Sequence, residues 1–447
     1  MPVDLIIYDG KISIANAYIT AGIAVEDGKV VKVAKKTNLP SASEKIDLKG
    51  NFILPGLIDV HTHLRDQKQA YEETFTTGTA AAAAGGITLC ADMPNNEPVT
   101  MDTETLRERM RAAADKTLTN IAFYSAFPTH PHEIPRVVDA GAVAFKLFMT
   151  KQIGGVDIES DDSLEKTFQQ TRQNHAPVAV HAEDKALLES IQNELKRTGK
   201  NGIDAYLKTH SPLVEEKATN RILSFVEKTK AQVHFCHISS KLGLDAVMGR
   251  KNAGLPVSCE VTSHHLLLSS SDLKRYGTIA LCDPPVRGKN DVEALWEALE
   301  NGLIDIIASD HAPHLLEEKK AESIWEVKPG FPSLETTVSL ILNEINKGRL
   351  SITDLIRLMA EKPAEIFHLN HRGHLEKGYN ADITIVDMHR EHRIDASKFY
   401  SKAKYSPFDG WKLKGKPIKT FVNGHLAMDD GEIVAKPGVG QILGWKL

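Results

Sequence analysis

Hydrophobic and polar positions follow two different patterns along this chain, and the pattern that covers more residues occupies its middle. There, short apolar runs of β-type residues are separated by stretches with helical periodicity, such as 102–116, 163–173, 212–230 and 291–302. Strand and helix in regular alternation predict a parallel sheet with crossover helices. A count of eight runs favours a closed (β/α)8 barrel over an open sheet. The runs are residues 52–60, 87–93, 121–127, 142–148, 177–183, 232–237, 256–262 and 303–310.

The two ends of the chain show the other pattern, with short strand-like runs and few helical stretches. Residues 4–10 and 22–28 each end in an Asp-Gly turn, and similar runs return at 381–387 and 417–425. Asp-Gly next to alternating runs favours hairpins. We therefore predict one small β-sandwich domain built from both termini. The predicted bounds are 1–52 with 375–447 for this domain, and 53–374 for the barrel.

Composition narrows the class of protein. Of 447 residues, 42% are hydrophobic and 25% are charged, which is ordinary for a globular chain and excludes general disorder. The net charge of −5 comes without a basic cluster, so nucleic acid and membrane surfaces are poor partners. The four cysteines form no C-x-x-C pair, and the N-terminus lacks the pattern of a signal peptide. We expect a cytoplasmic protein with reduced, buried thiols.

The one unusual count is 19 histidines, and several of them stand where predicted strands end. In a (β/α)8 barrel, the carboxyl ends of the strands carry the chemistry. The first run ends with His61, His63 and Arg65, which share one face because strand residues two apart point the same way. Two imidazoles on one face can chelate a single ion. The end of the first strand is therefore a candidate metal site.

Four further strand ends carry polar side chains. Lys146 lies within the apolar fourth run, His181 and His237 end the fifth and sixth runs, and Asp310 ends the eighth. Each alone has an ordinary explanation, such as a packed imidazole or a lysine whose ammonium reaches the rim. Together with His61 and His63 they predict a site of imidazoles and carboxylates, the ligand set of Zn²⁺ and similar ions. Alternation along the sixth strand points His234 to the opposite face and predicts a structural role for it.

The motifs around these residues resemble those of the amidohydrolase superfamily and, within it, the dihydroorotases. The similarity lies in GLIDVHTHLRD, ADMPNN, CEVTSHHLLL, DPPVR and ASDHAPHLLEEK, and FDGWKLKGKPIKTFVNGH extends it toward the C-terminus. It covers nearly the whole chain. The resemblance implies a barrel of the amidohydrolase type with two Zn²⁺ or similar divalent ions. It also implies a lysine that is carboxylated by CO₂ and bridges the two ions.

The resemblance implies a role for each strand-end residue. The implied ligands are His61, His63 and Asp310 for one metal and His181 and His237 for the other, with carboxylated Lys146 shared by both. A hydroxide that bridges the ions would be the nucleophile. Asp310 would take the proton from this nucleophile and pass it to the leaving amide nitrogen, as general base and then general acid.

A second set of residues is implied to hold substrate. In dihydroorotases, residues matching Arg65, Asn95 and His314 clasp the carboxylate of the substrate, and a guanidinium is a fork suited to a carboxylate. Some motifs depart from the family pattern: TSHH, MPNN and DPPVR stand where T-P-H-H, M-P-N-T and N-P-P-L-R are usual. Many bacterial relatives have an aspartate in place of the lysine. This chain has the lysine, Lys146, at that position.

The segment 148–160 contains a Gly-Gly pair and resembles a loop that the family uses as a lid over substrate. Gln152 and Ile153 are its candidate contact residues. Three further histidines lie in family motifs without a predicted role: His264, His265 and His311.

The leading hypothesis is a dihydroorotase, which interconverts L-dihydroorotate and N-carbamoyl-L-aspartate in the third step of pyrimidine biosynthesis. One alternative keeps the metals and changes the ring, as in hydantoinases, dihydropyrimidinases and allantoinases. Another is a non-catalytic paralogue that acts as a scaffold, although such chains typically lose metal ligands. The expected partner is the small-molecule substrate, within a homodimer or homotetramer that can associate with neighbouring pathway enzymes.

Overall fold

A closed barrel of eight parallel strands forms the centre of the molecule. The structure is a computed structural model and describes residues 2–14 and 17–444. The sheet runs in sequence order from its first strand to its last, and a bridge between Thr62 and His311 joins its two edges. All eight predicted runs contain one of these strands. They are β6 (Leu57–Thr62), β7 (Ile87–Asp92), β8 (Asn120–Ser125), β9 (Ala144–Phe148), β10 (Val178–His181), β11 (Val233–Phe235), β12 (Val257–Thr262) and β13 (Ile306–Ala308).

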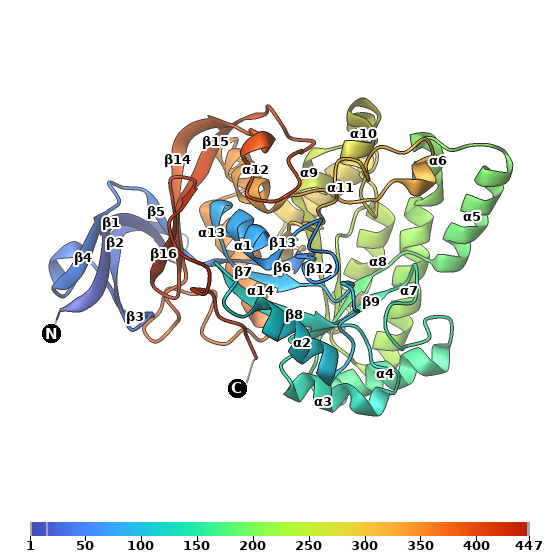
Figure 1. The fold of residues 1–447 in the computed structure, drawn as a ribbon, viewed down its shortest axis with the longest axis horizontal. Helices are drawn as coiled ribbons and strands as arrows, with labels where there is room; N and C mark the ends of the chain where they lie inside the picture. The colour runs from blue at the N-terminus through green and yellow to red at the C-terminus, as the bar shows by residue number, and fades with distance from the viewer. Residues whose placement is uncertain (1, 15–16, 445–447) are drawn as a thin grey trace.

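Helices surround the barrel, with at least one after each strand (Figure 1). The principal ones are α1 (Phe75–Ala84), α2 (Thr103–Ala113), α3 (Ile134–Asp139), α4 (Asp161–Gln173), α7 (Pro212–Thr229), α8 (Lys241–Asn252), α11 (Lys289–Glu300) and α12 (Leu334–Asn346). The remaining helices are α5 (Lys185–Arg197), α6 (Ile203–Thr209), α9 (Ser263–Leu267) and α10 (Ser270–Tyr276) in the connections between strands, and α13 (Ile352–Ile356) and α14 (Lys362–Ile366) after the barrel. Local signals set their limits; for example, the Asp102 side chain accepts the Thr105 N–H and starts α2.

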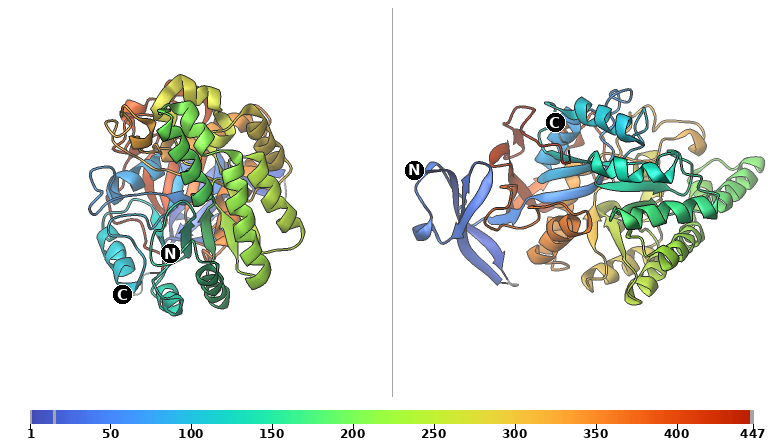
Figure 2. Two further views of the ribbon diagram at one scale, coloured as in Figure 1. Left: turned by 90° about the vertical axis from the view of Figure 1, so that its right-hand side faces the viewer. Right: turned by 90° about the horizontal axis from the view of Figure 1, so that it is seen from below.

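Both ends of the chain form a second sheet beside the barrel, visible on the left in the right-hand view of Figure 2. Its nine strands are β1 (Val3–Ile14), β2 (Ala17–Glu26), β3 (Lys29–Ala34), β4 (Ala42–Asp47), β5 (Phe52–Pro55), β14 (Ile383–Arg393), β15 (Lys412–Val422), β16 (His425–Asp429) and β17 (Glu432–Ile433). The N-terminal strands join the C-terminal ones where β5 pairs antiparallel with β14. The predicted fold class, an amidohydrolase-type barrel with a small β domain from both termini, is confirmed. The exact domain bounds stay a prediction.

One glycine connects the two sheets. The predicted single run 52–60 is two strands, because β5 belongs to the outer sheet and β6 to the barrel, with Gly56 between them. The Gly56 N–H donates to the Asp382 carbonyl at 2.7 Å, and a Cβ built on Gly56 would lie 2.3 Å from the Thr88 hydroxyl oxygen. Only a residue without a side chain fits this crossing.

We therefore expect Gly56→Ala to destabilise the protein by about 1–3 kcal/mol, the usual range for overpacking a dense interior. Chemical denaturation followed by circular dichroism measures this change. Gly249→Ala is the control, because Gly249 lies in α8 and a Cβ there meets nothing within 4 Å. That variant should gain up to about 1 kcal/mol from helix propensity. Equal stability of the two variants would contradict the close-packed crossing.

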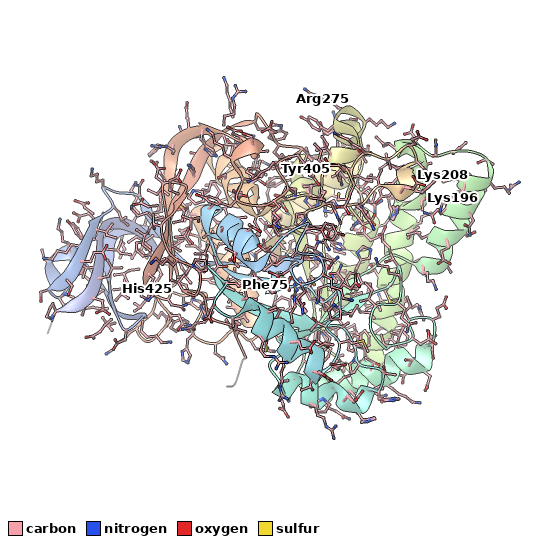
Figure 3. The ribbon with its side chains drawn as sticks, in the orientation of Figure 1. Phe75, Lys196, Lys208, Arg275, Tyr405 and His425 are labelled. Carbon is pink, nitrogen blue, oxygen red and sulfur yellow. The ribbon has the colours of Figure 1, made fainter. Side chains whose placement is uncertain are left out.

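The interior is continuous and apolar around the barrel. Phe75, at the start of α1, packs edge-on against Phe123 and beneath the Arg109 guanidinium. In Figure 3 it lies between the labelled His425 of the outer sheet and Lys196 of α5. The four cysteines are buried and free of disulfides, as predicted. Within the described residues, no helix combines the length and apolar character needed to cross a membrane.

Candidate metal centre

The predicted ligands come together at the carboxyl end of the barrel. His61 lies on β6, Lys146 on β9 and His181 at the last position of β10. His237 and Asp310 each lie two residues beyond a strand, and their backbones have positive φ angles of 34° and 46°. Residues other than glycine rarely adopt this conformation, and it is enriched at functional sites. Here it turns the chain directly after β11 and β13.

One group of donor atoms converges on Asp310. Its Oδ1 lies 3.3 Å from His61 Nε2 and 3.4 Å from His63 Nε2. The three residues together form a cluster whose donor atoms could hold one ion. All three side chains are at most 9% exposed, so a bound cation would be largely removed from water. The two histidines of the HxH pattern thus lie close to Asp310, and their role as ligands stays a prediction.

A second group lies beside the first. His181 Nδ1 and His237 Nε2 are 3.1 Å apart, and the rings of His61 and His237 are centred 5.1 Å from each other. Lys146 Nζ lies 3.5 Å from His61 Nε2 and 2.9 Å from Cys236 Sγ. Burial raises the pKa of Cys236 to about 12, so this group remains a neutral thiol. Lys146 thus lies beside His61 of the first group, while the roles of all six residues stay predictions.

Three outer residues orient these imidazoles. Glu260 Oε1 lies 2.5 Å from His61 Nδ1, Asn95 Oδ1 lies 2.7 Å from His63 Nδ1, and Glu183 Oε2 lies 2.9 Å from His181 Nε2. Each contact uses one ring nitrogen and leaves the other for the centre. Partners of this kind fix the tautomer of a ligating histidine and raise its basicity.

Glu260 and Glu183 were not singled out from the sequence. Glu260 lies within the apolar run V-S-C-E-V-T of β12, and a carboxylate inside a buried strand is a signal in its own right because it needs partners. Burial opposes its charge, yet the contacts with His61 and His234 hold the pKa of Glu260 well below its usual range. The prediction that His234 points away from His237 fails in detail. The His234 ring contacts Glu260, which also contacts His61, and the His237 ring is centred 5.1 Å from the His61 ring, so both rings lie toward the same centre. The chain turns after Phe235, where β11 ends.

Three imidazoles of the centre favour their neutral form. Burial, reinforced by nearby positive charges, lowers the pKa of His61, His63 and His237. Neutral imidazole offers the lone pair that a metal ion needs. Burial also raises the pKa of Asp310, although His61 and Lys146 counteract this effect.

A cavity of about 270 Å³ opens above these groups. Arg65, Asn95 and His314, the predicted substrate residues, all line it. Arg65 Nη2 lies 3.2 Å from His314 Nε2. Glu72, which sequence reasoning missed, also lines the cavity and lies 2.8 Å from His314 Nδ1. Nothing in the sequence marks Glu72, because it follows Tyr71 in an irregular segment without periodicity.

The glycine-rich segment after β9 reaches the same cavity. Thr150 and Lys151 are among the lining residues, and they directly precede the predicted contact residues Gln152 and Ile153 in the sequence. The Gly155 N–H donates to the Phe127 carbonyl at 2.8 Å, which ties this part of the segment to the end of β8. Its use as a lid stays a prediction.

The three histidines without a predicted role are buried and are not among the residues that line this cavity. His265 bonds to the Thr262 hydroxyl and the Pro284 carbonyl, so both its ring nitrogens are occupied. His311 Nδ1 accepts the Ser333 N–H at 3.1 Å at the start of α12. His264 packs against a phenylalanine ring, and its nitrogens have no hydrogen-bond partner among the described residues.

Comparisons with known proteins agree with this arrangement. Residues 52–427 match the model of the amidohydrolase family. The chain belongs to the amidohydrolase family. A dihydroorotase of Methanothermobacter thermautotrophicus is 36% identical to it over 422 residues, which cover 94% of each chain.

The hydantoinase branch of the amidohydrolases is equally similar. An L-hydantoinase of Paenarthrobacter aurescens is 34% identical over 448 residues and 98% of each chain. The solved structure of the L-hydantoinase (dihydropyrimidinase) from Arthrobacter aurescens superposes with a TM-score of 0.95 at 33% identity, over 99% of both chains. The protein is therefore a cyclic amidohydrolase. Sequence identity alone does not show whether its substrate ring is that of a dihydroorotase or that of a hydantoinase.

Proposed function

We propose that this amidohydrolase is a dihydroorotase that hydrolyses L-dihydroorotate reversibly to N-carbamoyl-L-aspartate. The observation that carries the proposal is the Arg65–His314 pair, 3.2 Å apart in the wall of the cavity that is also lined by five of the six predicted ligands, all except Lys146. The guanidinium of Arg65 is a fork suited to a carboxylate, which dihydroorotate carries and hydantoin lacks. The dihydroorotases among its relatives support the same reading.

The residues of the centre fit two divalent ions such as Zn²⁺. His61, His63 and Asp310 would hold one, His181 and His237 the other, and carboxylated Lys146 both. Lys146 is 1% exposed, and among the described residues no carboxylate lies within ion-pair distance of its Nζ. Conversion to a carbamate would remove this unpaired buried cation, which is otherwise unfavourable. Bound metals would polarise the amide carbonyl and lower the pKa of water.

The chain's own groups supply the proton transfer. Asp310 Oδ1 lies 3.3 Å from His61 Nε2 and 3.4 Å from His63 Nε2 and lines the cavity, which supports a role in accepting a proton from the attacking water. It would then give that proton to the ring nitrogen as the amide bond breaks. Arg65, His314 and the free amide nitrogen of Asn95 would hold the substrate while this happens.

A second candidate is hydrolysis of uncharged rings, such as hydantoins or dihydropyrimidines. The position of Glu72 next to Arg65 favours it, because this carboxylate reduces the positive charge available to a substrate. The close structural likeness to the L-hydantoinase from Arthrobacter aurescens supports it as well.

A substrate panel with and without metal tests the proposal. We expect hydrolysis of L-dihydroorotate to be fastest among dihydroorotate, dihydrouracil, hydantoin and allantoin. Prolonged chelation should remove at least about 99% of the activity, and Zn²⁺ should restore it, since the metals supply both nucleophile and electrophile. Full activity after verified metal removal would overturn the metal assignment. Fast hydrolysis of the uncharged rings with none of dihydroorotate would overturn the substrate.

A cytoplasmic location, a homodimer or homotetramer and association with pathway enzymes accompany this proposal. Gel filtration with light scattering on the full chain measures the oligomeric state directly.

A further inference from the structure

The predicted carboxylate clasp already contains a carboxylate of the protein. Glu72 lies in the segment between β6 and α1, is only 2% exposed, and lines the same cavity as Arg65 and His314. A buried acidic group is unfavourable unless other groups compensate its charge. Its partners are therefore informative about the subsite.

The first partner of Glu72 is His314. Burial lowers the pKa of His314 to about 4, so its ring is neutral and carries one proton. Glu72 Oε1 lies 2.8 Å from Nδ1 and can only accept a hydrogen bond, so the proton is on Nδ1. Nε2 is then free to accept from Arg65 Nη2 at 3.2 Å. Glu72 thus fixes the tautomer of His314 and orients one member of the clasp.

The second partner is Arg65. Its Nε lies 3.4 Å from Glu72 Oε2, yet neither atom has a hydrogen-bond partner among the described residues. Burial opposes the charge of Glu72, but the contacts with His314 and Arg65 keep its pKa below the usual value. An ionised carboxylate with a free oxygen therefore faces the guanidinium.

This arrangement acts differently on charged and uncharged substrates. A substrate carboxylate that reaches Arg65 comes close to Glu72 Oε2, and like charges at such range are strongly unfavourable. A ring N–H in the same place meets a free acceptor instead. Lys151 and Lys328 also line the cavity, but both are exposed, so solvent weakens their effect.

We infer that Glu72 is a specificity-determining residue, which offsets the charge of Arg65 and shifts the preference of the site from carboxylate-bearing cyclic amides toward uncharged ones. The inference rests on the proposed function, because it concerns the substrates of that same site. It names a group that reduces the preference of the site for carboxylate-bearing rings without reversing it.

The variant Glu72→Gln tests this inference. It keeps the shape of the side chain and the acceptor for His314, and it removes the negative charge. The measurement is kcat/KM for L-dihydroorotate divided by kcat/KM for dihydrouracil, which is the same ring without the carboxylate. We expect this ratio to rise by at least about tenfold, because close like charges have large effects on specificity. A ratio that stays within twofold of native, or falls, overturns the inference.

Two further variants separate charge from structure. Asp283→Asn removes a carboxylate that lines the same cavity and contacts His210 instead of Arg65 or His314, and it should leave the ratio within twofold. Glu72→Asp keeps the charge and should keep the ratio closer to native than Glu72→Gln does. A simple loss of packing would lower both activities together and leave their ratio unchanged.

Ligand binding distinguishes failure of this inference from failure of the proposed function. Orotate and uracil are planar analogues that are not hydrolysed, so calorimetry on the zinc-loaded protein reports their affinities without turnover. Tighter orotate binding by Glu72→Gln, with uracil unchanged, supports the inference even if neither protein hydrolyses dihydroorotate. Equal orotate affinity in the native protein and the variant overturns the inference even if the native protein is an active dihydroorotase.

Discussion

Asp310→Asn is expected to reduce kcat for the preferred cyclic amide by about 10³- to 10⁴-fold, the upper range for loss of a general acid–base group. The side chain keeps its size, but the amide cannot accept a proton and is a poor ligand. Because Asp310 Oδ1 lies within 3.4 Å of both His61 and His63, the change affects the metal position and the proton path together. Steady-state kinetics at saturating substrate measures the loss.

Metal analysis of the purified variant separates the two effects. A variant that retains both ions but lacks activity assigns the loss to proton transfer, whereas loss of one ion assigns it to coordination. Asp283→Asn is the matched control, because Asp283 lines the same cavity and contacts His210 instead of the predicted ligands. Its kcat should stay within about tenfold of native. Native-like turnover by Asp310→Asn would refute the role that we propose for Asp310.

Glu260→Gln is expected to weaken metal binding by about 10- to 100-fold, as found when the outer partner of a ligating histidine is changed. Glu260 accepts contacts on both oxygens, from His61 and from His234, and a glutamine has only one acceptor. One imidazole N–H would then face an amide NH₂. The unsatisfied buried donor should also reduce the free energy of unfolding by about 1–3 kcal/mol.

Zinc affinity by competition with a chelating dye and thermal unfolding measure the two consequences of Glu260→Gln. Glu215→Gln is a suitable comparison, because Glu215 is also buried and accepts bonds from Ser239 and Ser240, without touching a predicted ligand. We expect this second variant to lose stability and keep its zinc affinity. If both variants lose affinity equally, Glu260 has no special effect on the centre.

Much of the fold and of the predicted ligand set follows from the sequence. The barrel strands carry near-continuous apolar runs, and residues at strand ends meet at one edge of a parallel barrel, so His61, Lys146 and Asp310 could be brought together without a structure. Alternation was less informative where a strand is short. β11 has three residues and the chain turns directly after it, so the expected faces of His234 and His237 were unreliable.

The partners of these residues could not be derived in the same way. Periodicity gives the face on which a side chain lies, and it does not give the residue opposite. Glu260 lies on β12 and contacts His61 on β6, and Glu183 follows His181 by two residues. Glu72 comes from an irregular segment, and its contact with His314 spans 242 positions in the chain. Contacts of this kind depend on tertiary packing.

The crossing at Gly56 has a consequence for how the protein unfolds. β6, which carries His61 and is followed directly by His63, continues from β5, and β5 pairs with β14 in the outer sheet. Opening of the outer sheet would therefore disturb the position of two predicted ligands. Ions that bind only the intact centre would then stabilise the closed outer sheet as well. The amides of β14 should accordingly exchange with solvent more slowly in the metal-loaded protein than in the metal-free one.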